Sequence, residues 1–435
     1  MHNPRPHSDN KSFTFPFQCI ALKMVGAWPL ENSDSPNFIG ILYYAWSYTI
    51  IILITLTCLA QSSFVFYAWG DILTVTECGC TVLMGIHNLL RLIHLNRRRG
   101  ALKDLTTEFV NNIWISQDSN QFVARKCEKD TVLLKVISAM LFVLICMYVI
   151  LPLFELIHVT DSGSKPFPYK MIFPYDAYST FPYVVTYFLT SLAGFGVVTT
   201  LFAEDSLFGF FVAYTCGQFA ILHEKINGII DRVDKKSTNA DLEMSLCARE
   251  MKRKLRLKLI IDHHNTITKF CEHMEEFFSP ILLVNFTISS FLICLVGFQI
   301  AAVKMTLGNL AKLLIYIVSA LSQLFILCWK GDRLIECGSL TSWKFYSCEW
   351  ELLHDWQYPQ SPNNNNKHWN RKTTLNCPSG TSFIRDIAFS ILRSQKPLCI
   401  TAFKFSILSL KSFTAILSTS LSYFTLLQSL VEKNE

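Results

Sequence analysis

The sequence predicts an all-α, polytopic membrane protein with seven transmembrane helices, a cytoplasmic amino terminus and an extracellular carboxyl terminus. Its 435 residues are 51% hydrophobic and include 34 Phe, and its mean hydropathy is +0.31. Soluble proteins of this length are usually less apolar. Several stretches are long and apolar enough to cross a bilayer, and Lys and Arg gather in alternate segments between them.

The predicted spans differ in how apolar they are. The second is the weakest, because it contains Asp71, Glu77, His87, Asn88 and Arg91. In chain order the seven spans are Phe38–Ala60, Asp71–His94, Thr131–Phe154, Phe181–Ala203, Phe277–Val303, Leu310–Trp329 and Ala402–Leu430.

Ionisable residues within or beside these spans are candidates for a role inside the protein. A charged side chain at the centre of a span costs about 2.5 to 3.5 kcal/mol, so it faces protein or water unless it lies at the membrane surface. These residues are Glu77, Glu155, Glu204, Asp205, Lys312, Lys404 and Lys411.

The distribution of Lys and Arg predicts the orientation. A cytoplasmic amino terminus places 30 of these residues in the inside segments and 4 in the outside segments. Because positive charge is retained in the cytoplasm, this arrangement is favoured. The net charge of +6 lies next to helix ends, so it indicates membrane topology and not nucleic-acid binding.

The polar segments predict the division of the chain. The outer loop 161–180 is rich in Pro and aromatic residues, and it forms either a lid over the helix ends or an ordinary structured loop. The remaining parts are a cytoplasmic segment 1–37 without a cleaved signal peptide, spans one to six in 38–329, cytoplasmic helical extensions in 217–276, a cytoplasmic region 330–401 with a disordered insertion at 357–382, and a final helix with a short extracellular tail in 402–435.

The last predicted span carries small and polar residues at steps of three and four. This spacing places them on one stripe of a helix, where small hydroxyls serve either close helix packing or a wetted pore wall. Leu426 is the one bulky apolar member, as expected for a gate that closes by excluding water. The stripe consists of Ser412, Ala415, Thr419, Ser422, Leu426 and Ser429.

Other kinds of site have little support in the sequence. There is no nucleophile elbow, phosphate loop or paired-carboxylate motif, so an enzyme is not expected. No metal or other cofactor is expected, because the spacing of Asp262, His263, His264, Cys271 and His273 matches no standard zinc pattern. The fifteen cysteines are an odd number and none lies in a predicted extracellular loop, which argues against a disulfide framework.

Three segments near the carboxyl terminus together resemble the insect odorant receptor family. Trp28-Pro29, the Pro-aromatic outer loop and the seven inverted helices extend the resemblance over the chain. The three segments are Phe345-Tyr346-Ser347-Cys348-Glu349-Trp350, Arg393-Ser394-Gln395-Lys396-Pro397 and Ser420-Leu421-Ser422-Tyr423-Phe424.

This resemblance implies an odour-tuning subunit of a ligand-gated, non-selective cation channel. Such a subunit binds a small volatile odorant and assembles as a heterotetramer with the shared co-receptor in the plasma membrane of an olfactory sensory neuron. The family pattern makes Phe383–Ser394 an intersubunit anchor and Phe403–Leu430 the pore helix. It places pore-lining positions at Ser412, Thr419, Ser422, Leu426 and Ser429, with the gate at Leu426.

The resemblance also implies an odorant pocket in the outer halves of the second, third, fourth and sixth helices. Apolar side chains with a few hydroxyls suit a small volatile molecule. The candidate residues are Val82, Met147, Leu151, Tyr183, Tyr187, Phe188, Tyr316 and Ile317.

Two features depart from the family pattern. The insertion at 357–382 stands where the family has a short connection, and Lys411 places a cation near the inner pore entrance. A gustatory-type receptor channel is an alternative, although Gln428-Ser429 stands where that family has Gln-Phe. A G-protein-coupled receptor is supported by the helix count alone, and a transporter lacks visible inverted repeats.

Overall fold

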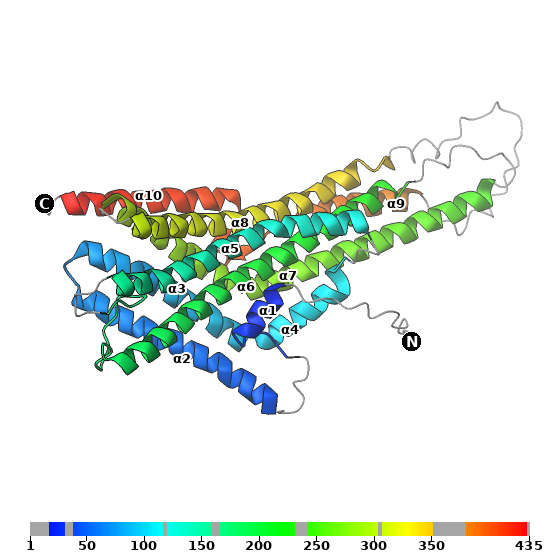
Figure 1. The fold of residues 1–435 in the computed structure, drawn as a ribbon. Coiled ribbons are helices and arrows are strands. Elements are labelled where there is room, and N and C mark those ends of the chain that lie inside the picture. Colours follow the sequence, from blue (N-terminus) through cyan, green and yellow to red (C-terminus); the bar gives the residue numbers. More distant parts are fainter. Residues whose placement is uncertain are drawn as a thin grey trace, which may run out of the picture.

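The computed structural model describes residues 17–30, 38–115, 120–158, 165–230, 242–302, 307–350 and 380–432. These parts form a bundle of long helices with one small hairpin (Figure 1). The elements are α1 Phe17–Met24, α2 Phe38–Tyr67, α3 Ile72–Arg97, α4 Arg99–Glu108, the π-helix η1 Phe109–Ile113, α5 Gln121–His158, α6 Thr180–Asn227, α7 Leu242–Ala302, α8 Leu307–Tyr346, α9 Gly380–Ser394, β1 Thr401–Ala402, β2 Ser406–Ile407 and α10 Leu410–Glu432.

Six helices in the described parts are long and apolar enough to cross a membrane: α2, α3, α5, α6, α7 and α8. They contain the first six predicted spans except for two end residues, Asp71, which caps α3, and Val303, which lies outside the described residues. α10, with 23 residues, is not among these six. The chain is therefore a largely helical protein with six candidate spans, and a seventh crossing by α10 stays a prediction.

The start of the last helix differs from the prediction. It begins at Leu410, not at Ala402 or Phe403, because β1 and β2 pair as an antiparallel hairpin between Thr401 and Ile407. The tip holds Phe403 and Lys404 at φ 51° and 63°, a left-handed conformation that an α-helix excludes. Apart from this short hairpin, the regular elements of the described residues are helices, in agreement with the predicted all-α class.

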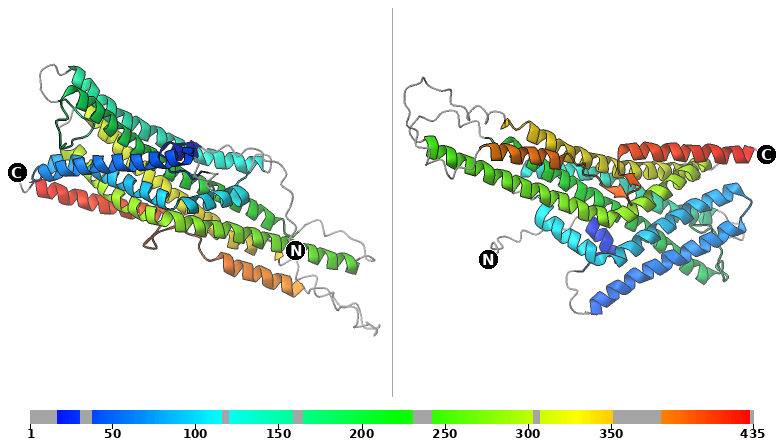
Figure 2. Two further views of the ribbon diagram at one scale, coloured as in Figure 1. Left: turned by 90° about the horizontal axis from the view of Figure 1, so that it is seen from below. Right: turned by 180° about the vertical axis from the view of Figure 1, so that it is seen from behind.

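Several helices extend well beyond their apolar stretches. α6, α7 and α8 continue together toward one end of the molecule, where α9 packs on α8 (Figures 1 and 2). α10 lies along α7 and α8 at the other end. The expected anchor helix Phe383–Ser394 lies within α9, whereas the insertion 357–382 lies outside the described residues except for the first turn of α9.

An aromatic cluster joins the short segment after α3 to the main bundle. Phe109 is fully buried, and its ring centroid lies 4.8 Å from that of Phe211 and 5.9 Å from that of Phe270. Trp114 stacks on Tyr214 at 4.7 Å. Aromatic pairs of this kind add packing energy beyond the area they bury, so the cluster fixes η1 against α6 and α7.

A buried ionic network joins α3 and α6. The Arg91 side chain is 1% exposed, and its Nη1 lies 2.7 Å from Asp205 Oδ1 and 3.5 Å from Glu204 Oε2. Arg91 Nε also donates to His87 Nε2 at 3.0 Å. A buried charge requires a partner of opposite sign and hydrogen bonds to remain ionised, and here both helices supply them.

The same network reaches α8. Gln323 donates its side-chain amide to Asp205 Oδ2, so one carboxylate is held by Arg91 of α3 and by an amide of α8. Three residues flagged by the sequence, Arg91, Glu204 and Asp205, thus come together although α3 and α6 are far apart in the chain. The network ties three helices at one level of the bundle.

Replacing Arg91 by Met should strongly destabilise the protein. Two buried carboxylates would lose their cation, and breaking a buried pair in this way costs about 3 to 5 kcal/mol. The measurement is the thermal unfolding of the detergent-solubilised protein, followed by size-exclusion chromatography of a fluorescent fusion. Arg97→Met is the matched control, because Arg97 is exposed at the end of α3. Equal unfolding temperatures for the two variants would contradict a stabilising network.

Candidate ligand cavity

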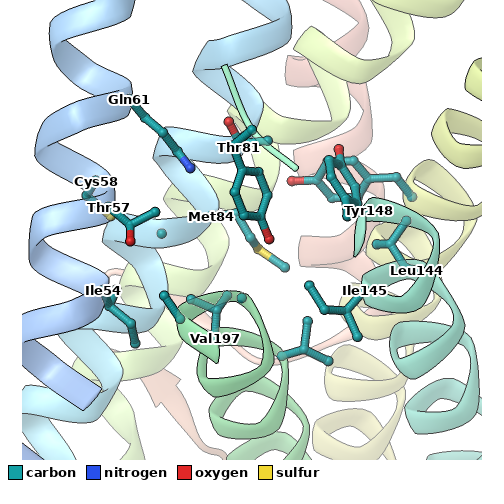
Figure 3. Close-up of a pocket in the computed structure, with 16 residues that line it drawn as sticks. Ile54, Thr57, Cys58, Gln61, Thr81, Met84, Leu144, Ile145, Tyr148 and Val197 are labelled. Carbon is teal, nitrogen blue, oxygen red and sulfur yellow. The ribbon is translucent and has the colours of Figure 1, made fainter. Parts of the chain in front are cut away.

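A cavity lies between α2, α3, α5, α6 and α8, and its empty space of about 610 Å³ includes its opening to the surroundings. Figure 3 shows the side chains of four of these helices converging on it. The cavity lies one to two helical turns from the ionic network, because Gly85, Val198 and Tyr316 line it while Arg91, Asp205 and Gln323 follow six or seven residues later.

The lining of the cavity is mainly apolar and carries no ionisable carboxylate or ammonium group. Its polar atoms are hydroxyls, one amide and one thiol. Such a lining suits a small, neutral, largely apolar molecule with one or two polar atoms. The lining residues are Ile54, Thr57, Cys58, Gln61, Thr81, Met84, Gly85, Leu144, Ile145, Tyr148, Tyr169, Ala193, Gly194, Val197, Val198 and Tyr316.

Gln61 supplies an unusual polar atom to this lining. The residue is 4% exposed, and in the described structure its Oε1 is buried without a hydrogen-bond partner. Figure 3 shows its side chain extending from α2 toward the cavity. A buried carbonyl without a donor costs free energy, and a ligand with a hydroxyl or amine hydrogen would supply that donor.

The loop between α5 and α6 contributes directly to the cavity wall. Tyr169 of this loop stacks on Tyr148 of α5, with ring centroids 5.6 Å apart. Burial raises the pKa of the Tyr169 phenol, so this hydroxyl remains protonated and can donate a hydrogen bond. A salt bridge of 2.8 Å between Lys170 Nζ and Glu77 Oε2 holds the loop to α3.

Two glycines let the walls approach closely. A Cβ at Gly85 would clash with Cys58 Sγ, so Gly85 allows α2 to pack against α3. A Cβ at Gly194 would clash with the hydroxyl of Tyr169 and come within 2.8 Å of Ile145 Cδ1. The absence of a side chain at Gly194 therefore leaves room for the Tyr169 hydroxyl in the cavity.

Of the eight residues predicted to contact ligand, Tyr316 lines the cavity. Its neighbour Ile317 packs in the adjoining apolar cluster, and Val82 and Met147 stand next to the lining residues Thr81 and Tyr148. Adjacent residues on a helix point about 100° apart. Val82, Met147 and Ile317 thus lie at the level of the cavity, on neighbouring faces of α3, α5 and α8.

The other four predicted residues lie elsewhere. The hydroxyl of Tyr183 donates to the Pro166 carbonyl oxygen at 2.6 Å, and that of Tyr187 donates to the Val149 carbonyl oxygen. Leu151 is half-buried outside the lining, and Phe188 is 65% exposed on the outer face of α6.

Sequence reasoning missed the contribution of α2 and of Tyr169. The first span was predicted to end at Ala60, whereas α2 continues to Tyr67 and carries Gln61 inside the helix. The amide of Gln61, directly after the predicted span, was the feature of the sequence that could have indicated a polar contribution from α2.

The stripe on α10 faces away from the bundle. Ala415, Thr419, Ser422, Leu426 and Ser429 are all exposed. The hydroxyls of Thr419, Ser422 and Ser429 donate to carbonyl oxygens of the same helix at 2.8–3.0 Å. Their oxygen lone pairs are therefore left on the outer surface. Ser412 is half-buried and bonds to the β2 segment instead.

The opposite side of α10 packs on the bundle. Ser420 is 2% exposed and donates to the Ser290 carbonyl oxygen at 3.0 Å. Phe413 packs edge-on against Phe325 of α8, and Tyr423 stacks on Phe291 of α7. Lys411 lies on the exposed side of the first turn, near the edge of the stripe.

A family model described as "7tm Odorant receptor" matches residues 71–421. The chain belongs to the insect odorant receptor family. This chain is 44% identical to Odorant receptor 13a of Drosophila melanogaster over 434 residues, which cover 98% of this chain and 97% of that one. It is 27% identical to Odorant receptor 22c of the same species over 271 residues, or 61% of this chain and 58% of that one.

Solved structures agree on the fold. The fold of this chain matches that of the insect olfactory receptor OR5 from Machilis hrabei in complex with eugenol. The TM-score is 0.71, and the identity is 16% over 95% of this chain and 97% of that one. The structure of OR5 described without that ligand matches with a TM-score of 0.72. The sequence and the fold thus match a family of receptors and not a family of enzymes. The carboxyl-terminal segments predicted this family.

Replacing Gln61 by Leu should weaken binding of ligands that donate a hydrogen bond. One lost hydrogen bond of about 1 to 1.5 kcal/mol corresponds to roughly a fivefold to tenfold weaker affinity. The measurement is the ligand-induced rise in unfolding temperature for matched pairs of a small alcohol and its methyl ether. Affinity for the ethers should be almost unchanged.

Gln121→Leu is the control for this variant, because Gln121 is exposed in the first turn of α5. An equal loss for alcohols and ethers would contradict donor recognition by Gln61.

Proposed function

We propose that the protein is an odour-tuning subunit of a ligand-gated, non-selective cation channel formed with a co-receptor. A small organic odorant occupies the cavity between α2, α3, α5, α6 and α8, and its binding opens a pore lined in part by α10. The neutral, largely apolar cavity in a chain of this family is the observation that carries the proposal. The structure of OR5 with eugenol supports a small organic ligand.

The exposed stripe of α10 supports the pore. Its hydroxyl hydrogens are used within the helix, so outward lone pairs are available to water or a cation. Leu426 is 57% exposed on the same stripe, where the corresponding side chains of neighbouring subunits would close a water-filled path. Lys411 lies at the stripe's edge, in agreement with a partner subunit supplying most of the inner entrance.

Apolar surface on α8 and α9 supports assembly at the opposite end of the molecule. Trp343 and Tyr346 of α8 are 58% and 59% exposed, and Phe389 and Leu392 of α9 are 69% and 67% exposed. Exposed large apolar side chains at the end of a bundle mark an interaction surface. This surface is the proposed contact with the other subunits of a heterotetramer.

The distribution of Lys and Arg supports a cytoplasmic amino terminus, an α8–α9 end in the cytoplasm and an extracellular carboxyl terminus. In this orientation the cavity lies in the outer half of a plasma membrane, and Tyr169 lies on the outer side as part of the proposed lid.

Co-expression with the co-receptor in a cell that lacks odorant receptors should produce an odorant-evoked inward cation current. The current should persist when G-protein signalling is blocked, because the pore is part of the receptor. Surface biotinylation verifies delivery to the membrane, and a carboxyl-terminal tag should be stained without permeabilisation. A tag accessible only after permeabilisation would contradict the proposed orientation.

Replacing Leu426 by Ala should raise the current that flows without odorant, because a smaller side chain no longer excludes water from the closed pore. Leu421→Ala is the matched control. Leu421 is also exposed, at 62%, but lies about 140° around the helix from Leu426. The same resting current in both variants, at equal surface expression, would argue against a gate at Leu426.

A further inference from the structure

Two thiols meet where α6 packs on α8. Cys216 of α6 and Cys337 of α8 both pack against the main core cluster where the two helices meet, and each thiol has the largest influence on the pKa of the other. Both are free and half-buried. They lie 13 residues past the predicted span Phe181–Ala203 and 8 residues past Leu310–Trp329, so both belong to the helical extensions outside the membrane.

Hydrogen bonds on either side hold this pair in register. Gln323 donates to Asp205, and the ring of His223 bonds to Thr341 Oγ1 at 3.0 Å. Both bonds join positions separated by 118 residues, so α6 and α8 run parallel with constant register between them. Cys337 lies about one helical turn from the position level with Cys216, on the same face. The thiols are therefore held together by the fold.

The surroundings of Cys337 favour its thiolate. Interaction with the Cys216 thiol and the charges of Arg333 and Lys126 lower the pKa of the Cys337 thiol, whereas burial and the charge of Glu336 raise it, and the net direction is downward. Arg333 also forms a salt bridge of 2.9 Å with Glu336. Interaction with Cys337 and burial raise the pKa of Cys216. A thiol with a lowered pKa is the more reactive of a pair, and a sensor cysteine is often next to a second, resolving thiol.

We propose that Cys216 and Cys337 form a redox-sensitive pair, which a hydroperoxide oxidises to a disulfide between α6 and α8. The Cys337 thiolate attacks the peroxide, the O–O bond breaks, and a sulfenic acid forms with release of water. The Cys216 sulfur then attacks the sulfenic sulfur and a second water leaves. In sum, two thiols and one hydrogen peroxide give one disulfide and two water molecules, and the two electrons pass to the peroxide.

The disulfide would hold α8 in its present position against α6. α8 contacts the α10 segment through Phe325 and Phe413, and a Cβ at Gly331 of α8 would clash with Leu408. A clamp on α8 therefore restrains the helix that touches α10. This consequence rests on the proposed channel function, whereas the chemistry of the thiol pair does not.

The test treats the purified, reduced receptor with hydrogen peroxide, blocks the remaining thiols with N-ethylmaleimide, and maps cysteine-containing peptides by mass spectrometry without reduction. The expected result is a peptide cross-linked between Cys216 and Cys337, reversed by dithiothreitol, with labelling lost at both positions together. In Cys216→Ala, the sulfenic acid should persist at Cys337 and be trapped by dimedone. Cys146→Ala, at a half-buried cysteine of α5, should behave like the wild type.

Continued labelling of both thiols after peroxide, or cross-linking of either thiol to a different cysteine, would overturn the proposal. Where the disulfide forms, peroxide should also reduce the odorant-evoked current of the wild type but not of Cys216→Ala. A cross-linked receptor that never carries current, with surface expression verified, would contradict the channel function and leave the redox pair intact.

Discussion

The fold depends on keeping the charge of Arg91 inside an apolar bundle. A guanidinium keeps its charge when it is buried, so its burial costs free energy unless carboxylates and hydrogen-bond partners surround it. Asp205 and Glu204 of α6 provide them directly, and Gln323 of α8 holds Asp205 from the other side. These contacts are directional, unlike the hydrophobic packing around them. They therefore set the relative positions of three helices that apolar side chains alone leave free to slide.

The cavity follows from that constraint. α3, α6 and α8 are tied together one to two turns away, and α2 and α5 complete the wall. Gly194 leaves room there for the ring of Tyr169, which stacks on Tyr148. The loop after α5 contributes Tyr169 to the lining, while Tyr183 and Tyr187 use their hydroxyls to hold nearby backbone. Gln61 and the threonine hydroxyls add further polar groups to the lining.

α10 is attached to the bundle differently from the other long helices. One side packs through Phe413 and Ser420, and the other side presents a stripe of small hydroxyl residues and Leu426. α8 connects the parts of the protein: Tyr316 lines the cavity, Gln323 joins the ionic network, Phe325 touches α10, and Cys337 meets Cys216. A small displacement of α8 would therefore change the contacts at each of these sites.

The sequence by itself predicted the class of protein and seven spans, six of which correspond to the candidate membrane helices of the described residues, because hydrophobic length and helical periodicity are local properties of the chain. The carboxyl-terminal segments were also sufficient to identify the family. The tertiary structure alone decided that Arg91 meets Asp205, that Gln61 and Tyr169 enter the cavity, and that a hairpin delays the start of α10. Such outcomes depend on helix rotation and register, where a shift of one residue turns a side chain by about 100°, and no local pattern encodes that choice.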